Sequence, residues 1–118
     1  MNDSTHSLKE EVHRLYYEPE IGSSYKNTYG EENIRNLVEK CRSLNGTDMQ
    51  TMLEILGAYV KSTDLTTSYV SLGVLHALGM DKEVEDAYEW ALKLDEKDLF
   101  ISHFDIGKSL ADYFFLKK

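Results

Sequence analysis

The chain has 118 residues, with 21 acidic side chains against 13 lysines and arginines, which gives a net charge of −8 and a pI near 4.9. Such a chain lacks the basic footprint that nucleic acids and anionic membranes require, so neither is expected as a direct partner. The apolar fraction of 42% is too high for a disordered chain, and one proline without sustained Val/Ile/Thr alternation argues against a β protein.

The length and the cysteine content indicate one domain in a reducing compartment. A chain of this size buries roughly two-thirds of its unfolded surface in a single core. Its one cysteine, Cys41, permits no internal disulfide. The first six residues contain no basic segment leading into an apolar one, and the apolar run 70–80 is too short to cross a bilayer. We therefore expect a cytoplasmic protein with a single α-helical domain over residues 1–118.

Apolar residues at helical spacing predict three helices in the first half of the chain. The first has Ser4 or Ser7 as its N-cap and ends near Tyr17, before Glu18-Pro19. The second runs from Glu31 to about Leu44, Asn45-Gly46 ends it, and the third runs from an N-cap at Thr47 or Asp48 to about Lys61. The residues expected on their buried faces are Leu8, Val12, Leu15, Tyr16, Ile34, Leu37, Val38, Cys41, Met49, Met52, Leu53, Leu56, Tyr59 and Val60.

A loop rich in Gly, Ser, Asn and Thr separates the first two helices, from Glu20 to Gly30. It contains Tyr25 and Tyr29. Two interpretations stay open for these tyrosines: they lie over the core as a lid, or they form part of an interface, where a ring with a hydroxyl is well suited.

Three further helices are expected in the second half, for about six in all. Thr63-Asp64 begins the fourth, Gly79 in a left-handed conformation ends it, Asp81 caps the fifth, and the sixth begins near Lys97. The residues expected on the buried faces of the last two are Val84, Ala87, Tyr88, Ala91, Leu92, Phe100, Phe104, Gly107, Ala111 and Phe114. The sixth helix is expected to cap the stack, with Phe115 left partly exposed.

Glycines recur inside three of the predicted helices, at Gly57, Gly73 and Gly107. Glycine costs about 1 kcal/mol relative to alanine in a helix interior. A neighbouring helix that approaches closely would explain why it is tolerated there. We therefore expect helix crossings at these positions.

The stretch 67–98 resembles a tetratricopeptide repeat. The positions that carry the resemblance are Tyr69, Leu72-Gly73, Gly79, Val84, Tyr88, Ala91-Leu92 and Glu96, with Val84 and Glu96 in place of the family's alanine and proline and His76 in place of an aromatic residue. Ile106-Gly107 follows Leu72-Gly73 by 34 residues, the period of that family. The resemblance implies antiparallel helices stacked as helical hairpins, tetratricopeptide-like in the second half. It also implies one possible function, an adaptor or secretion chaperone that binds an extended peptide in a concave groove lined by Thr67, Val70, Val74 and Ala77.

No pattern in the sequence indicates catalysis, a cofactor or a metal. His6, His13, His76 and His103 lack zinc-ligand spacing, and there is no nucleophile elbow or phosphate-binding glycine loop. Cys41 lies in an apolar stripe, which predicts a packed thiol rather than a nucleophile. His76 and His103 are expected to be core or edge histidines. We expect no catalytic, cofactor or metal site; an enzyme with an unrecognised site stays the alternative.

The acidic residues concentrate between Asp81 and Asp98, where eight carboxylates stand against three lysines, a net of −5. They form either a solvated helix face or a binding surface. Trp90 shares a helical flank with Glu83 and Asp86, and an indole beside carboxylates has the composition of an interface hot spot. The predicted partner-binding residues are Glu83, Asp86, Glu89, Trp90 and Asp95. The expected function is a non-enzymatic module that presents an acidic surface to a basic protein. An immunity protein that neutralises a toxin nuclease is one concrete class, suggested by size and acidity alone.

Overall fold

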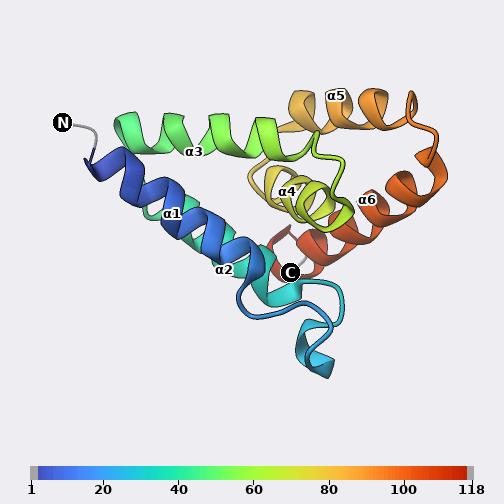
Figure 1. Ribbon diagram of the computed structural model, residues 1–118, viewed down its shortest axis with the longest axis horizontal. Helices are drawn as coiled ribbons and strands as arrows, with labels where there is room; N and C mark the ends of the chain where they lie inside the picture. The colour runs from blue at the N-terminus through green and yellow to red at the C-terminus, as the bar shows by residue number, and fades with distance from the viewer. Residues whose placement is uncertain (1–2, 117–118) are drawn as a thin grey trace.

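The structure, a computed structural model, describes residues 3–116, with only the backbone of residues 3–7, 26 and 116. Six α-helices make up most of this range: α1 Asp3–Tyr17, α2 Glu31–Arg42, α3 Gly46–Tyr59, α4 Leu65–Ala77, α5 Asp81–Ala91 and α6 Lys97–Ala111 (Figure 1). A 3₁₀ turn at Tyr25–Asn27 and a π-helical turn at Asp112–Leu116 complete the elements. The predicted all-α fold with six helices is confirmed. None of the helices in this range is long and apolar enough to span a bilayer.

α4 is the central helix of the molecule. It packs against α2, α3, α5 and α6. Figure 1 shows α4 almost end-on, with α3 and α5 above it and α6 beside it. Ten of its 13 residues are buried. The proposed groove residues Thr67, Val70, Val74 and Ala77 are all among them. That part of the adaptor hypothesis is wrong, because these side chains face packed helices instead of an open groove.

The closest helix approach joins α4 to α6 through two glycines. A Cβ atom on Gly107 would lie 3.0 Å from the carbonyl oxygen of Tyr69 and 3.6 Å from the Cα of Gly73. A Cβ on Gly73 would lie 2.9 Å from the Cδ1 of Ile34 and 3.2 Å from the carbonyl oxygen of Gly107. The crossings expected at Gly73 and Gly107 are confirmed. The crossing expected at Gly57 is wrong, because a Cβ atom on that residue would have no atom of another element within 4 Å.

Several helix starts differ from those predicted. α1 already begins at Asp3; the side chains of its expected caps, Ser4 and Ser7, lie outside the described residues. α3 begins at Gly46, with the extended Asn45 in the N-cap position, so neither Thr47 nor Asp48 caps it. α5 begins at Asp81 itself, after Met80 in the cap position, so Asp81 acts through its charge in the first turn. Two predictions are confirmed: α4 begins directly after Thr63-Asp64, and Gly79 is left-handed at φ 76°. The Asp64 carboxylate caps α4 by accepting from the Thr67 amide at 3.0 Å.

The buried side chains form one core cluster that joins all six helices. Those predicted correctly are Leu8, Val12, Tyr16, Ile34, Leu37, Val38, Cys41, Met52, Leu56, Val60, Val84, Ala87, Ala91, Phe100, Phe104, Gly107 and Ala111. Leu15, Met49, Leu53, Tyr59 and Tyr88 are only partly buried and pack at its edge. The prediction that Leu92 is buried is wrong, because Leu92 is 59% exposed where α5 ends and the chain turns toward α6.

The C-terminal turn packs on the body through Phe115 rather than Phe114. Phe115 lies against the core, with the guanidinium of Arg42 5.2 Å from its ring centre. Phe114 is half-buried beside Arg35, at 5.6 Å, and does not join the core. The prediction that Phe114 is the buried ring is therefore wrong. The π-helical turn after Ala111 shifts the register that an uninterrupted α-helix would have kept.

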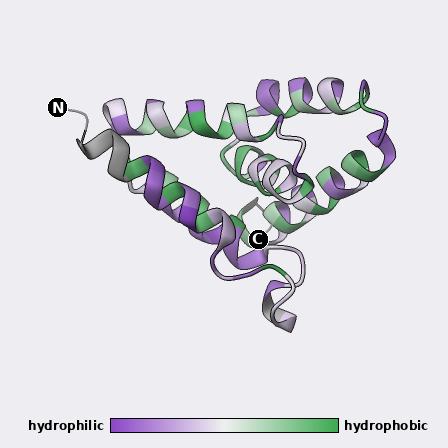
Figure 2. Ribbon diagram, in the orientation of Figure 1, coloured by the Kyte–Doolittle hydropathy of each residue, from purple (hydrophilic) through white to green (hydrophobic). Residues whose placement is uncertain are grey.

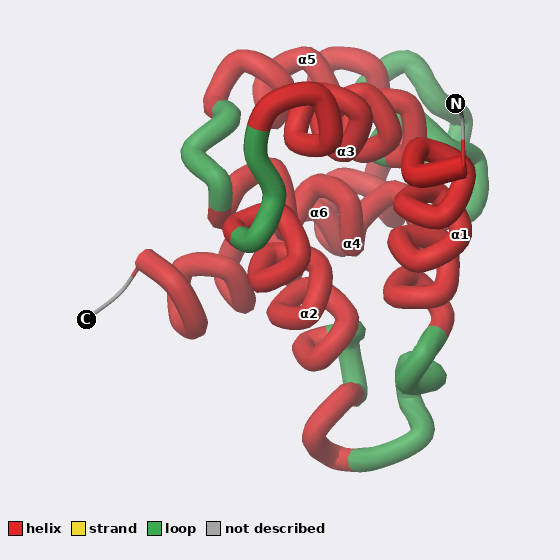
Figure 3. Tube along the Cα trace, turned by 90° about the vertical axis from the view of Figure 1, so that its left-hand side faces the viewer, coloured by secondary structure: helices red, strands yellow, loops and turns green. Residues whose placement is uncertain are grey.

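The loop between α1 and α2 is held by two buried asparagines. The Asn27 amide donates to the Asn33 side chain at 2.9 Å and to the carbonyl of Pro19 at 3.3 Å, and Asn33 donates to the same carbonyl at 3.0 Å. The loop extends away from the helices in Figures 1 and 3. Tyr25 is 85% exposed and Tyr29 46%, so the lid interpretation is wrong for Tyr25.

The glycine crossing gives a matched pair of substitutions. Gly107→Ala should cost about 1–3 kcal/mol of unfolding free energy, because the new methyl meets backbone atoms that cannot rotate away. Gly57→Ala, also inside a helix, should be neutral or stabilise by up to about 1 kcal/mol, because its site has room. Urea denaturation of both variants measures the difference. Equal effects would contradict the close crossing.

Phe114 and Phe115 give a second matched pair of substitutions. Phe115→Ala should cost about 1–3 kcal/mol, less than the full cost of a buried phenylalanine because the ring is half-buried. Phe114→Ala should cost about 1 kcal/mol or less, the size of an exposed cation–π contact with Arg35. Thermal denaturation ranks the two variants, and a larger loss for Phe114→Ala would overturn the packing assignment.

Candidate functional site

The acidic residues lie on α5, on the turn that joins it to α6 and in the first turn of α6, and Figure 2 shows hydrophilic residues over much of α5. The eight carboxylates are those of Asp81, Glu83, Glu85, Asp86, Glu89, Asp95, Glu96 and Asp98. Within the described residues, none of them forms an ion pair or accepts a side-chain hydrogen bond. None of these carboxylates is therefore paired directly with a cation among the described residues, and the three lysines of the segment leave it with a net charge of −5. We call this set the acidic surface.

Trp90 lies at the edge of the acidic surface and also packs inward. Its ring meets Phe100 of α6 edge-on, with 5.8 Å between ring centres, and is half-buried. Glu83 and Asp86, seven and four residues before it on α5, share its flank and are also half-buried. Trp90 thus covers the adjoining helix and keeps an exposed part beside two carboxylates. The three residues therefore share one flank of α5, and their role in binding stays a prediction.

Glu89 lies on a different flank of α5, in a cleft between α5 and α6. The cleft has a volume of about 510 Å³ and is lined by Val84, Glu85, Tyr88, Glu89, Asp105 and Lys108. The Tyr88 hydroxyl donates to Asp105 Oδ1 at 2.7 Å, and the Lys108 ammonium lies 5.2 Å from the centre of the Tyr88 ring. Burial, followed by the hydrogen bond and charge of Asp105, raises the pKa of Tyr88. The phenol therefore stays a neutral hydrogen-bond donor at physiological pH.

Asp95 lies apart from both groups, beside a smaller hollow of about 110 Å³ that it shares with Thr63, Leu94, Glu96 and Phe100. The structure thus brings together Glu83, Asp86 and Trp90, and places Glu89 and Asp95 at two separate points around them. Phe100 links the hollow to Trp90, because its ring contacts both.

Sequence reasoning missed Glu85, Asp105 and Lys108. In the sequence Glu85 stands out only as a charge, although it precedes Tyr88 and Glu89 at helical spacing. Asp105 and Lys108 share a face of α6, but Asp105 is 17 residues from Tyr88, so no local pattern pairs them. Only the packing of α6 on α5 reveals the cleft.

His76, His103 and Cys41 have structural surroundings, whereas the His6 side chain lies outside the described residues. His76 Nε2 lies 2.8 Å from Asp112 Oδ1 and joins α4 to the C-terminal turn. The His103 ring lies against Tyr69, with 5.4 Å between ring centres. Burial raises the pKa of the Cys41 thiol to about 11. In the part of the chain that the structure describes, no three His, Cys, Asp or Glu side chains are grouped so that they could hold a metal ion.

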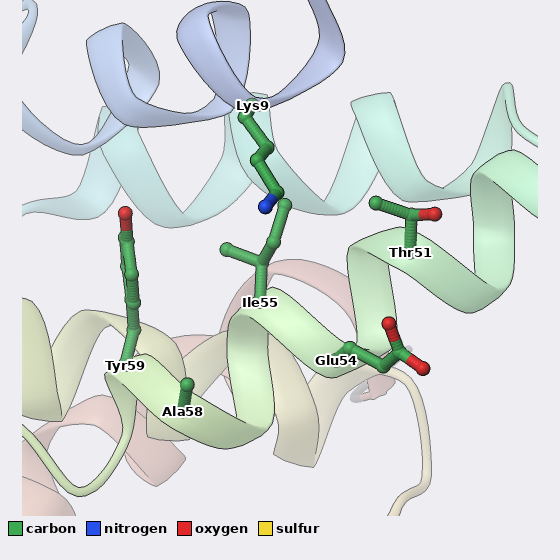
Figure 4. Close-up of a pocket in the computed structure, with 6 residues that line it drawn as sticks. All are labelled: Lys9, Thr51, Glu54, Ile55, Ala58 and Tyr59. Carbon is green, nitrogen blue, oxygen red and sulfur yellow. The ribbon is translucent and has the colours of Figure 1, made fainter. Parts of the chain in front are cut away.

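A further pocket, of about 240 Å³, lies between α1 and α3. Figure 4 shows Lys9 reaching from α1 toward Ile55, with Tyr59 and Ala58 along the same side of α3 and Glu54 directed away from Lys9. Its floor is apolar and its two charged groups do not meet. This arrangement offers no acid–base pair.

Cys41 provides a test of the packing. The raised pKa and full burial should leave the thiol unreactive toward an aromatic disulfide reagent at pH 8, where little thiolate exists. The same protein in denaturant should react rapidly and with one equivalent. Stopped-flow absorbance follows both reactions, and fast labelling of the folded protein would contradict the buried position.

No protein-family model, curated protein or solved structure matches this chain. The resemblance of residues 67–98 to a tetratricopeptide repeat therefore stays a prediction. Function has to be inferred from the side chains and their contacts.

Proposed function

We propose that this chain is a non-enzymatic module that binds a basic protein through the acidic surface. The observation that carries the proposal is the set of eight carboxylates, none of which has a cationic or hydrogen-bonding partner within the described residues. A local excess of charge of one sign draws an oppositely charged partner and raises its association rate.

The flank of Glu83, Asp86 and Trp90 supplies the central contact in this proposal. Glu83 and Asp86 are half-buried, so a partner that covers them removes less water than it would from fully solvated charges. The indole of Trp90, which packs edge-on against Phe100, offers apolar area at little cost in conformational entropy because its side chain has only two rotatable bonds. Asp95 and Glu89 would support the contact from either side.

The cleft between α5 and α6 suits a lysine or arginine side chain of the partner. Such a side chain would meet the carboxylates of Glu85 and Glu89 at the rim and the Tyr88 ring inside, where Lys108 already lies over the ring. The cleft therefore offers a cation two carboxylates and the face of an aromatic ring. The cationic side chain of the partner would either replace the Lys108 ammonium at the Tyr88 ring or bind beside it.

A toxin nuclease is the concrete partner class that we propose. Nuclease active sites are basic because they hold phosphates, and a carboxylate-rich protein can occupy such a site and inhibit it. This chain would then act as an immunity protein.

The test measures association and dissociation rates against the protein encoded by the neighbouring gene. Glu83→Gln with Asp86→Asn should slow association about tenfold at low salt and flatten its salt dependence, because these charges steer the encounter. Trp90→Ala should mainly speed dissociation, at a cost on the order of 2 kcal/mol. Glu85→Gln with Glu89→Gln reports whether the cleft takes part.

The matched control is Glu18→Gln with Glu39→Gln, which removes the same charge from exposed positions outside the acidic surface. Its association and dissociation rates should stay within about twofold of those of the unsubstituted protein, because salt screens charges that lie away from the contact. Thermal melts accompany Trp90→Ala, because the indole also packs on Phe100. Unchanged rates for both the Glu83/Asp86 variant and Trp90→Ala would end the proposal.

A further inference from the structure

Another cavity, remote in sequence from the acidic surface, lies at the base of the projecting loop. Its walls come from the end of α1, from the loop and from the start of α4, and its volume is about 230 Å³. The lining residues are Tyr16, Tyr17, Glu20, Ile21, Asp64 and Thr66. We propose that this cavity binds a guanidinium group on a short aliphatic stem. The proposal does not rest on the function proposed above.

The hydrogen bonds inside the wall fix the direction of both tyrosine hydroxyls. Thr67 donates its hydroxyl proton to Asp64 Oδ2 at 2.6 Å, so the Tyr17 hydroxyl, 3.0 Å from Thr67 Oγ1, must donate to it. Ser71 donates to the carbonyl of Thr67 at 2.8 Å, so the Tyr16 hydroxyl likewise donates to Ser71 Oγ. Both phenols have used their one proton on α4, and each keeps only acceptor capacity.

The cavity is consequently almost without donors among its side chains. Glu20 and Asp64 carry carboxylates, which only accept, and Ile21 has no polar atom. Thr66 has the one side-chain hydroxyl with a proton not committed to a described partner. A ligand that consists of donors and positive charge matches this lining, whereas an anion or an acceptor-rich group would meet like charge and find few donors.

The shape and polarity of the walls favour guanidinium over ammonium. Tyr17 and Ile21 present a ring and an aliphatic chain, against which a flat, weakly hydrated guanidinium and its stem can pack. A guanidinium also carries five donors, enough to reach two carboxylates that stand on different elements. An ammonium is compact and strongly hydrated, so it gains less from an aromatic wall.

The cavity is preorganised by the hydrogen bonds around it. The Asn27 amide donates to the carbonyl of Glu20 at 3.2 Å, and the Asn27 carbonyl oxygen accepts from the Gly22 amide at 2.8 Å. These bonds fix the backbone on both sides of Ile21. Asp64 is fixed on the other wall by its bonds to Thr67. A ligand therefore needs to order the exposed Glu20 side chain but not the backbone around it or the Asp64 carboxylate.

The probe is n-propylguanidinium, and n-propylurea is its neutral control of the same shape. Titration of the full chain, followed by ¹H–¹⁵N NMR, should give saturable shifts at the amides of residues 16–18, 20, 21 and 64–66 and a dissociation constant at least about tenfold lower than for the urea, because a charge-assisted bond is about twice as strong as a neutral one. Glu20→Gln should weaken binding several-fold. Equal binding of the urea, shifts confined to α5, or no saturable shift would overturn the proposal.

Glu18→Gln is the matched control, because Glu18 is exposed and close in sequence but does not line the cavity. It should change the dissociation constant by less than about twofold, since exposed charges outside a site are screened by salt. An equal loss for Glu18→Gln and Glu20→Gln would mean general charge attraction and would overturn the site. Far-ultraviolet circular dichroism checks that each variant is folded.

A second arm separates the sources of the guanidinium. N-acetylarginine methylamide carries the same group with a peptide backbone on each side. Binding as tight as that of n-propylguanidinium would assign the cavity to an arginine side chain of a protein, and binding of the small cation alone would assign it to a free metabolite. Both results support a guanidinium site.

Discussion

The contact between α4 and α6 at Gly73 and Gly107 is the constraint on which the rest of the structure depends. Because neither helix has a side chain at the crossing, the two approach until Gly107 lies against the carbonyl of Tyr69. This brings α4 to the centre, where α2, α3 and α5 can also reach it. Because α6 is held so closely, α5 lies over the pair and forms its cleft with α6. The position of the acidic surface thus follows from two glycines.

A helix buried on so many sides must find protein partners for its buried polar side chains. In α4 these side chains are small hydroxyls that bond to neighbouring carbonyls and to Tyr16. Ser68 donates to the carbonyl of Val60, and Ser71 donates within α4 while it accepts from Tyr16. Among the described residues, no buried side-chain nitrogen or oxygen lacks a partner. These bonds also tie the end of α1 to α4. The hydrogen bonds that satisfy the buried hydroxyls of α4 therefore also hold in place the wall of the guanidinium cavity.

The sequence predicted what depends on near neighbours and missed what depends on packing. The apolar stripes of α2 and α6 were found because their spacing repeats within one helix. Gly57 and Gly107 look alike in the sequence, and only the neighbouring helix distinguishes them. The cleft was missed because Tyr88 and Asp105 meet only after α6 has folded back. The starts of α3 and α5 were misplaced because several polar residues there could each serve as a cap.

The distribution of charge on α5 favours the binding proposal over a purely structural explanation. Asp81 and Glu83 lie in the first turn, where the positive end of the helix dipole stabilises carboxylates. Glu89 lies in the last turn, which contains no basic residue, and there the dipole disfavours a negative charge. The dipole of α5 therefore explains the acids at its start, and the dipole of α6 explains Glu96 and Asp98 at the start of that helix, but neither explains Glu89. Solubility would be served equally well by carboxylates spread over all six helices, whereas a basic partner needs them concentrated in one place.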